Sequence, residues 1–303
     1  MYNEETKNNF ISSLKTPSMK TMFASLFKRS AAYEAELDKD ILAFGVKECS
    51  NLLMLLGPKS IRHIGSLKSQ FSKYVDWGQQ TGIASKNYWL LVPEDEDFAK
   101  NAFSSRYVKD WNELAMIVDI GLSVSYDKYL VYLLYMGIMG ENFVELSHLE
   151  DNDVDKVNKT ITTARGVFRI EDPLLKVITA NEYYKEKKTR DEDSKYFIKP
   201  FKTKHLEMKP IGYQHVSRVI GKLNNGINET NPTIMKLFTP MTIWRSGLFY
   251  SLYQIEQVKN ALLGDDFSIV SKVYGNKNSY SSYLPDYELY KEIFWGRNVN
   301  IQD

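Results

Sequence analysis

The sequence predicts a mainly α-helical protein of two domains with one small β-sheet. Over most of the 303 residues, apolar side chains recur at intervals of three or four, as in amphipathic helices. The segment 159–170 instead alternates and is rich in β-branched and aromatic residues, which indicates a short hairpin. A charged segment, Glu94–Asp97, follows Pro93 and marks a boundary. We therefore expect domains at 1–98 and 99–303.

Composition excludes several classes of protein. The apolar fraction of 43% is sufficient for ordinary hydrophobic cores. The single cysteine, Cys49, excludes an intramolecular disulfide and is expected as a buried apolar residue in a reducing cytoplasm. The polar N-terminal segment is no signal peptide, and the longest apolar run, 129–140, is shorter than the roughly 20 residues of a membrane span. These features predict a soluble cytoplasmic protein that does not enter a membrane.

The first domain contains the clearest amphipathic helix, which follows Gly57-Pro58. Its apolar residues, three or four apart, predict one buried stripe: Ile61, Ile64, Leu67, Phe71 and Tyr74. A neighbouring face alternates cations with small hydroxyl residues: Lys59, Arg62, Ser66, Ser69 and Lys73. Such a face suits close contact with a phosphate backbone, although a solvated helix face has the same spacing.

The second domain is expected to begin with a helix at 108–120 and an apolar helix at 129–135. Gly137 ends the latter, and a short helix follows with Phe143, Val144 and Leu146 inward. The hairpin turns at Arg165-Gly166, and helices are expected at 173–184 and 213–223. In the last of these, four residues are expected inward (Tyr213, Val216, Ile220 and Leu223) and three on another face (His215, Arg218 and Lys222).

Three motifs in the second domain resemble the conserved boxes of the tyrosine recombinase (phage integrase) family. The first box, T-G-L-R-x-x-E-L-x-x-L before an acidic turn, is similar to 136–146, where the arginine position is occupied by Met139. The second box, T-P-H-x-L-R, is similar to 239–244. Its histidine and arginine positions are occupied by Met241 and Trp244. In the third box, L-G-H, the histidine position is Asp265, and a tyrosine follows ten residues after the glycine, at Tyr274.

The resemblance extends to the first domain and implies a two-domain clamp on double-stranded DNA. The apolar pattern of 40–82 is similar to the SAM-like helical core-binding domain of the family. The helix at 213–223 would lie against the major groove, with Arg218 as the best candidate for reading a base, because a guanidinium can bond both acceptors of guanine. The general-acid lysine of the family hairpin has no convincing counterpart, since its position falls within 162–164 and Lys159 comes too early.

The replaced positions predict a recombinase-like domain that has lost strand transfer. Removing one charge-stabilising donor typically lowers an enzymatic rate about 10²–10³-fold, and here both arginines and the histidines are replaced. Arg245 is one residue past the lost arginine, where a helix turns the side chain by about 100°, so we expect it to contact DNA rather than to restore catalysis. The four histidines lack metal-ligand spacing, and no cofactor motif is present.

The resemblance thus implies a sequence-specific DNA-binding protein without enzymatic activity: a prophage transcriptional repressor that maintains lysogeny at operator-like sites in a bacterial host. A regulatory peptide or protein is a further expected partner. Two alternatives stay open, namely an accessory architectural factor for a recombinase and a residual recombinase that uses Arg245 and Tyr274. The aromatic tail after Ser279 is expected to pack in cis or on a neighbouring subunit.

Overall fold

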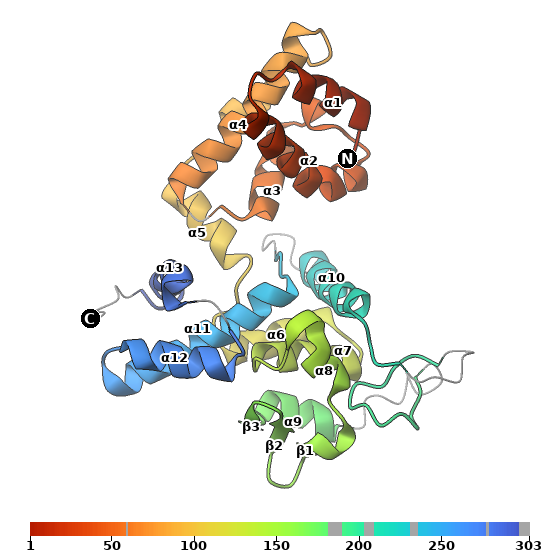
Figure 1. The fold of residues 1–303 in the computed structure, drawn as a ribbon, viewed down its shortest axis with the longest axis vertical. Coiled ribbons are helices and arrows are strands. Elements are labelled where there is room, and N and C mark those ends of the chain that lie inside the picture. The colour runs from red at the N-terminus through yellow and green to blue at the C-terminus, as the bar shows by residue number, and fades with distance from the viewer. Residues whose placement is uncertain (59, 181–189, 203–208, 231–235, 277–278, 297–303) are drawn as a thin grey trace. The chain divides into compact units, whose positions relative to one another are not determined.

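The computed structural model describes residues 1–58, 60–180, 190–202, 209–230, 236–276 and 279–296. It divides into two compact units, Met1–Phe103 (unit 1) and Ser104–Asp303 (unit 2). The expected fold class is confirmed, because the described elements are mainly α-helices with one small antiparallel sheet (Figure 1). The limits 1–98 and 99–303 for the functional domains stay a prediction.

Unit 1 is a group of helices around an aromatic core. Its helices are α1 (Glu4–Ser13), α2 (Pro17–Leu37), α3 (Val46–Leu56), α4 (Ile61–Gln80) and α5 (Glu96–Ser104), with 3-10 turns at Ile41–Ala43 and Tyr88–Leu91. Phe10 packs its ring against Phe23, Phe27 and Tyr74, at centroid distances of 4.8, 6.0 and 5.1 Å. Ser60 caps α4 by accepting a hydrogen bond from the His63 amide at 3.2 Å.

Unit 2 is built around α7 (Ser125–Tyr135), of which every residue is buried. The helices that pack on it are α6 (Trp111–Gly121), α8 (Val144–His148), α9 (Asp172–Thr179), α10 (Tyr213–Thr230) and α11 (Pro240–Lys259). The remaining helices are α12 (Gly264–Val273) and α13 (Leu284–Trp295). A helix that is surrounded on all sides must be apolar all round, which explains the unbroken run of apolar residues in its second half.

The expected hairpin is confirmed and belongs to a three-stranded antiparallel sheet. Strands β1 (Val154–Asp155), β2 (Thr160–Thr163) and β3 (Gly166–Arg169) lie in the order β1-β2-β3. Ile161 pairs with Phe168, and both side chains are buried, so that this face of the sheet joins the core of unit 2. The turn between β2 and β3 presents Arg165.

The buried stripes are confirmed apart from three residues. Ile61, Val144 and Tyr213 are 44%, 53% and 61% exposed, whereas the sequence predicted them inward. Each is the first residue of its helix, α4, α8 or α10. At this position no preceding helical turn supports the side chain, so helical spacing alone overestimates its burial. Cys49 is buried as expected.

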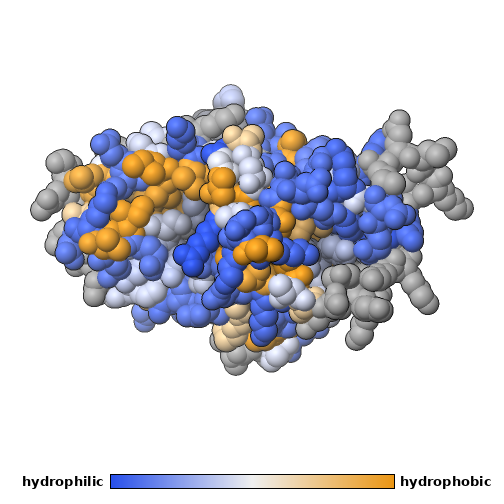
Figure 2. All heavy atoms as spheres, turned by 90° about the horizontal axis from the view of Figure 1, so that it is seen from below, coloured by the Kyte–Doolittle hydropathy of each residue, from blue (hydrophilic) through white to orange (hydrophobic). Residues whose placement is uncertain are grey.

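The described part of the C-terminal tail packs in cis. Tyr287 and Tyr290 of α13 are fully buried, and the Tyr287 hydroxyl donates to Glu256 of α11 at 2.6 Å. Trp295 stacks on Tyr253 with ring centroids 4.2 Å apart. On the α11–α12 side of unit 2, Figure 2 shows a band of apolar side chains. The exposed apolar residues of this region include Val258, Leu263, Ile269 and Val273. Within the described residues, no helix is both long and apolar enough to cross a membrane.

Candidate nucleic-acid interface

Two of the box positions meet where α7, α11 and α12 converge. The Trp244 ring lies edge-on to the Tyr274 ring, with centroids 5.9 Å apart and an interplanar angle of 71°. Both side chains are buried, at 5% and 7% exposure. Gly137 has a φ of +90° and places its backbone against the Tyr274 ring, which leaves no room for a Cβ atom. We call Trp244, Tyr274 and the loop at Gly137 the central cluster.

The Tyr274 hydroxyl faces the protein interior. It donates to the backbone carbonyl oxygen of Tyr135 at 3.1 Å and lies 3.0 Å from the Ser251 hydroxyl. Burial raises the pKa of Tyr274 above the usual value of 10, against the lowering effects of Ser251 and Arg165. The hydroxyl is therefore neutral near pH 7 and already engaged with internal partners.

Arg165, which the motif comparison did not select, closes the central cluster. Its guanidinium donates to the Glu145 carboxylate, with Nε and Oε1 2.9 Å apart, and to the Gly137 carbonyl oxygen at 2.7 Å. A further hydrogen bond goes to the carbonyl oxygen of Val273. One side chain of the hairpin thus joins α8, the loop after α7 and the end of α12. The sequence offered one signal for this role, since Arg165 directly follows residues 162–164, where the family lysine is expected.

The other box positions lie outside the central cluster. Met139 is partly buried and packs against the core of unit 2, whereas Met241 is 44% exposed in the first turn of α11. Asp265 is exposed at the start of α12. Tyr274 directly follows the other end of this helix, about 14 Å away at 1.5 Å per residue. Arg245 is directed towards α13, where its guanidinium lies 3.5 Å from the Asp286 carboxylate.

The expected phosphate-binding face of α4 is exposed over its described residues. Arg62, Ser66, Ser69 and Lys73 are all exposed, and their spacing of four, three and four residues places them on one side of the helix. Ser66 accepts a hydrogen bond from Gln70 at 3.1 Å. Among the described residues neither Arg62 nor Lys73 has an acidic partner. Lys59 lies outside the described residues.

On the expected face of α10, Arg218 and Lys222 are exposed, whereas His215 is buried. Arg218 is exposed, and Lys222 is exposed while its ammonium lies 2.9 Å from the Asp127 carboxylate. His215 is 8% exposed, with Nε2 3.6 Å from Asp127 Oδ1. Asp127 is itself buried beside Arg190, 3.4 Å away. These two residues are distant in sequence, so the spacing within α10 could not reveal that they cover His215.

His215 is held in its neutral form. Burial and then the neighbouring Arg190 lower the pKa of its imidazole to about 4, and Lys222 and Arg218 act in the same direction, whereas Asp127 opposes the shift. Neither ring nitrogen has a hydrogen-bond partner among the described residues. A neutral, enclosed imidazole is not suited to a phosphate contact, so the exposed cations of this face are Arg218 and Lys222.

Comparison with family models gives two matches. The model described as MrpR, N-terminal core-binding domain, matches residues 1–80, and the model described as MrpR, C-terminal catalytic domain, matches residues 112–294. Together they include α4, α10 and the central cluster. A comparison with curated proteins gives no match.

Several solved structures are similar over nearly the whole chain. The crystal structure of XerA recombinase is 14% identical, with 94% of this chain and 92% of that chain covered at a TM-score of 0.40. The Tn1549 transposon integrase in complex with circular intermediate DNA is 15% identical, with 93% and 94% covered at a TM-score of 0.37. The integrase of mycobacterium phage Brujita is 11% identical, with 99% and 94% covered at a TM-score of 0.33.

Proposed function

Because the chain belongs to the MrpR family, with one model over residues 1–80 and a second over 112–294, we propose that it binds specific double-stranded DNA sites without cutting them and thereby represses transcription. The observation that best supports the proposal is the geometry of Tyr274 in the central cluster. There the tyrosine hydroxyl that would attack DNA is turned inward and bonded to the backbone of Tyr135.

Exposed cations on α4 and α10 supply the DNA contacts. Arg62 and Lys73 of α4 bind phosphates, with Ser66 and Ser69 between them allowing close approach of the backbone. Lys59, which the sequence pattern groups with these residues, lies outside the described residues. On α10, Arg218 reads a guanine edge. Lys222 adds positive charge beside it, reduced by its ion pair with Asp127. Arg245 and His215 contribute less to this interface, because Asp286 pairs with the former and burial shields the latter.

The chemistry around Tyr274 supports a protein that does not cut DNA. Strand transfer needs an activated tyrosine and cations that hold the phosphate oxygens as charge develops. Burial raises the pKa of Tyr274, and Arg165, whose charge acts on this hydroxyl, is paired with Glu145. The family arginine positions hold Met139 and Trp244, neither of which can stabilise an oxyanion.

The biological role we propose is maintenance of lysogeny. The chain resembles the recombinase-fold master repressor of SPβ-like prophages, which is of this degenerate type. A repressor of this kind would occupy operator-like sites in the bacterial cytoplasm until a regulatory peptide or protein relieves binding. An accessory factor for a recombinase would instead act only in its presence, so repression of a reporter in a host that lacks any recombinase separates the two roles.

In a gel-shift experiment with genomic fragments of the host phage, we expect one discrete fragment to stay bound at about 150 mM salt. Arg218→Ala should weaken that complex about 10–100-fold, because a bidentate arginine–guanine contact contributes about 1–3 kcal/mol of discrimination. Lys156→Ala removes another exposed cation of unit 2, outside the proposed interface, and should leave affinity unchanged. Salt-labile retention of every fragment, or of none, would contradict specific binding.

On a nicked suicide substrate that contains the retained site, we expect no covalent protein–DNA adduct. The inward hydrogen bonds of Tyr274 and the raised pKa of its hydroxyl both oppose attack on a phosphodiester. An active tyrosine recombinase on its own substrate serves as the positive control. A denaturation-resistant adduct that disappears in Tyr274→Phe would establish the residual recombinase instead.

A further inference from the structure

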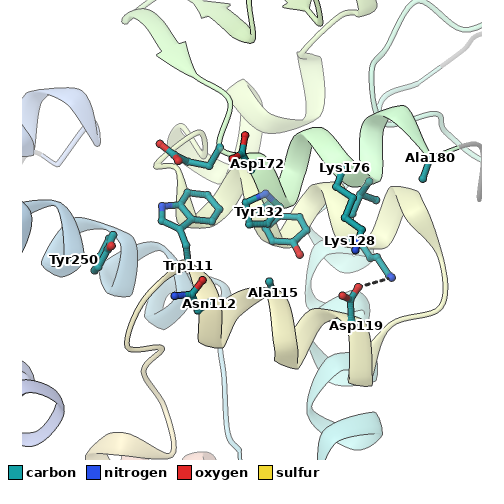
Figure 3. Close-up of a pocket in the computed structure, with 13 residues that line it drawn as sticks. Trp111, Asn112, Ala115, Asp119, Lys128, Tyr132, Asp172, Lys176, Ala180 and Tyr250 are labelled. Atoms are coloured by element: carbon teal, nitrogen blue, oxygen red, sulfur yellow. Dashed lines mark hydrogen bonds and ion pairs between the residues drawn. The ribbon is translucent and has the colours of Figure 1, made fainter.

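Unit 2 contains a cavity that the DNA-binding proposal does not use. It has a volume of about 750 Å³ and lies between α6, α7 and α9, with Tyr250 of α11 at one end (Figure 3). None of the box positions lines it. Its volume is within the range of about 300–1,000 Å³ that is usual for ligand sites.

One wall of the cavity is aromatic. The rings of Trp111 and Tyr132 lie nearly parallel, with centroids 6.1 Å apart and an interplanar angle of 23°. Figure 3 shows both side chains directed into the same space, with Trp111 between Tyr132 and Tyr250. An indole face of this kind attracts cations through its quadrupole.

The Tyr132 hydroxyl is an unused hydrogen-bonding group in this wall. The residue is 1% exposed, and the hydroxyl has no protein partner among the described residues. Burial, and then the charge of Asp119, raise the pKa of this hydroxyl above its usual value of 10, so it is neutral and can both accept and donate a hydrogen bond. Figure 3 shows this hydroxyl on the side of Ala115 and Asp119, where it can bond a part of a ligand that extends beyond the ring of Trp111.

The start of α9 gives a negative charge to the end of the cavity where Trp111 lies, which we call the aromatic end. Glu171 and Asp172 both line the cavity, and Figure 3 shows Asp172 beside the ring of Trp111. Asp172 has only a loose, exposed ion pair with Lys159 at 3.6 Å, which is weak in water. Glu171 has no ion-pair partner among the described residues.

The two lysines of the cavity do not cancel this charge. Lys128 is neutralised by Asp119, with the ammonium and carboxylate 2.8 Å apart (Figure 3). Lys176 lies with Lys128 and Asp119, on the far side of Tyr132 from Trp111 in Figure 3, and is exposed to solvent. The aromatic end of the cavity therefore combines two carboxylates and an indole face.

We propose that this cavity binds the arginine side chain of a peptide. A guanidinium is planar, so it stacks on Trp111 while its edge donates to Glu171 and Asp172. A compact ammonium has no planar face to stack on the indole. The volume exceeds the needs of one guanidinium and leaves room for flanking peptide residues. The site does not depend on DNA binding.

The tryptophan indole N–H signals of the ¹⁵N-labelled full-length protein test this proposal. There are five tryptophans, and Trp111→Phe assigns the Trp111 signal by its loss. Titration with the tripeptide amide Gly-Arg-Gly should move that signal with saturation in the millimolar range, while the same peptide with citrulline, the neutral isostere, should not. Absence of a shift, or an equal shift with citrulline, would overturn the proposal.

Variants and a second probe locate the binding. Glu171→Gln combined with Asp172→Asn should weaken binding at least tenfold, and Tyr132→Phe severalfold, whereas Asp265→Asn, an exposed carboxylate on α12, should change nothing. Unweakened binding in the double variant would contradict the site.

Agmatine carries the same guanidinium without a peptide. Tighter binding of the tripeptide supports a peptide ligand, and equal or tighter binding of agmatine would overturn that part of the proposal.

Discussion

Gly247→Ala should lower the free energy of unfolding of unit 2 by about 3 kcal/mol, the upper part of the usual range for overpacking. Gly247 lies where α11 crosses α7, and a Cβ atom there would overlap the backbone carbonyl oxygen of Tyr135. The same Cβ would lie 2.9 Å from the Tyr274 hydroxyl. Because the main clash is with backbone, a change of rotamer cannot relieve it. Urea denaturation, followed at the transition of unit 2, measures the effect.

Gly221→Ala is the matched control for this substitution. Gly221 is an exposed residue inside α10, and a Cβ atom there meets nothing within 4 Å. Alanine should stabilise the helix by about 0.5–1 kcal/mol through the lower conformational entropy of the unfolded chain. Adding Tyr274→Phe to Gly247→Ala should not restore stability, because the Tyr135 carbonyl remains. An unchanged Gly247→Ala protein would refute the close crossing of α7 and α11.

Acidification from pH 7 to about 4.5 should lower the free energy of unfolding by about 2–3 kcal/mol through the protonation of His215 alone. In the unfolded chain this imidazole takes up a proton below about pH 6.5, whereas its pKa in the folded protein is lowered to about 4. Between these values the unfolded state binds more protons, so stability falls as the pH falls. Charging His215 in place would set a second cation beside buried Arg190, which Asp127 compensates only in part.

His215→Leu isolates this contribution. Each protein is compared with itself at the two pH values, so the packing change in the variant cancels. Between pH 7 and pH 4.5, the free energy of unfolding should fall by about 2–3 kcal/mol more in the wild-type protein than in His215→Leu. Urea denaturation measures both values. Equal losses in the two proteins would show that His215 becomes protonated without opening its surroundings, and would contradict the lowered pKa.

The helical pattern was predictable because it depends on neighbouring residues only. The buried stripe of α4 follows from side chains three and four residues apart, and the Thr239-Pro240 start of α11 follows from capping chemistry. The hairpin follows in the same way from alternation and a turn. Even here the first residue of a helix was misjudged, as Ile61 shows, because burial at a helix end depends on what packs there.

The central cluster was predictable only in part. The box spacing selected Trp244 and Tyr274, whose rings lie together in the structure. It did not reveal that Arg165 bonds three separate backbone and side-chain partners there, because these lie 20 to 108 residues away in sequence. The cavity at Trp111 likewise combines α6, α7, α9 and α11, and no local pattern relates these helices.

The sequence by itself therefore determined the fold class, several of the helices, the hairpin and most of the apolar faces, since these depend on local spacing. The tertiary structure alone decided which polar groups are enclosed. Arg218 and His215 share one face of α10, but Asp127 and Arg190 cover only His215, while Arg218 stays open to solvent. Arg245 likewise pairs with Asp286 of α13. Burial of a charge depends on partners brought together by folding, and helical periodicity carries no information about them.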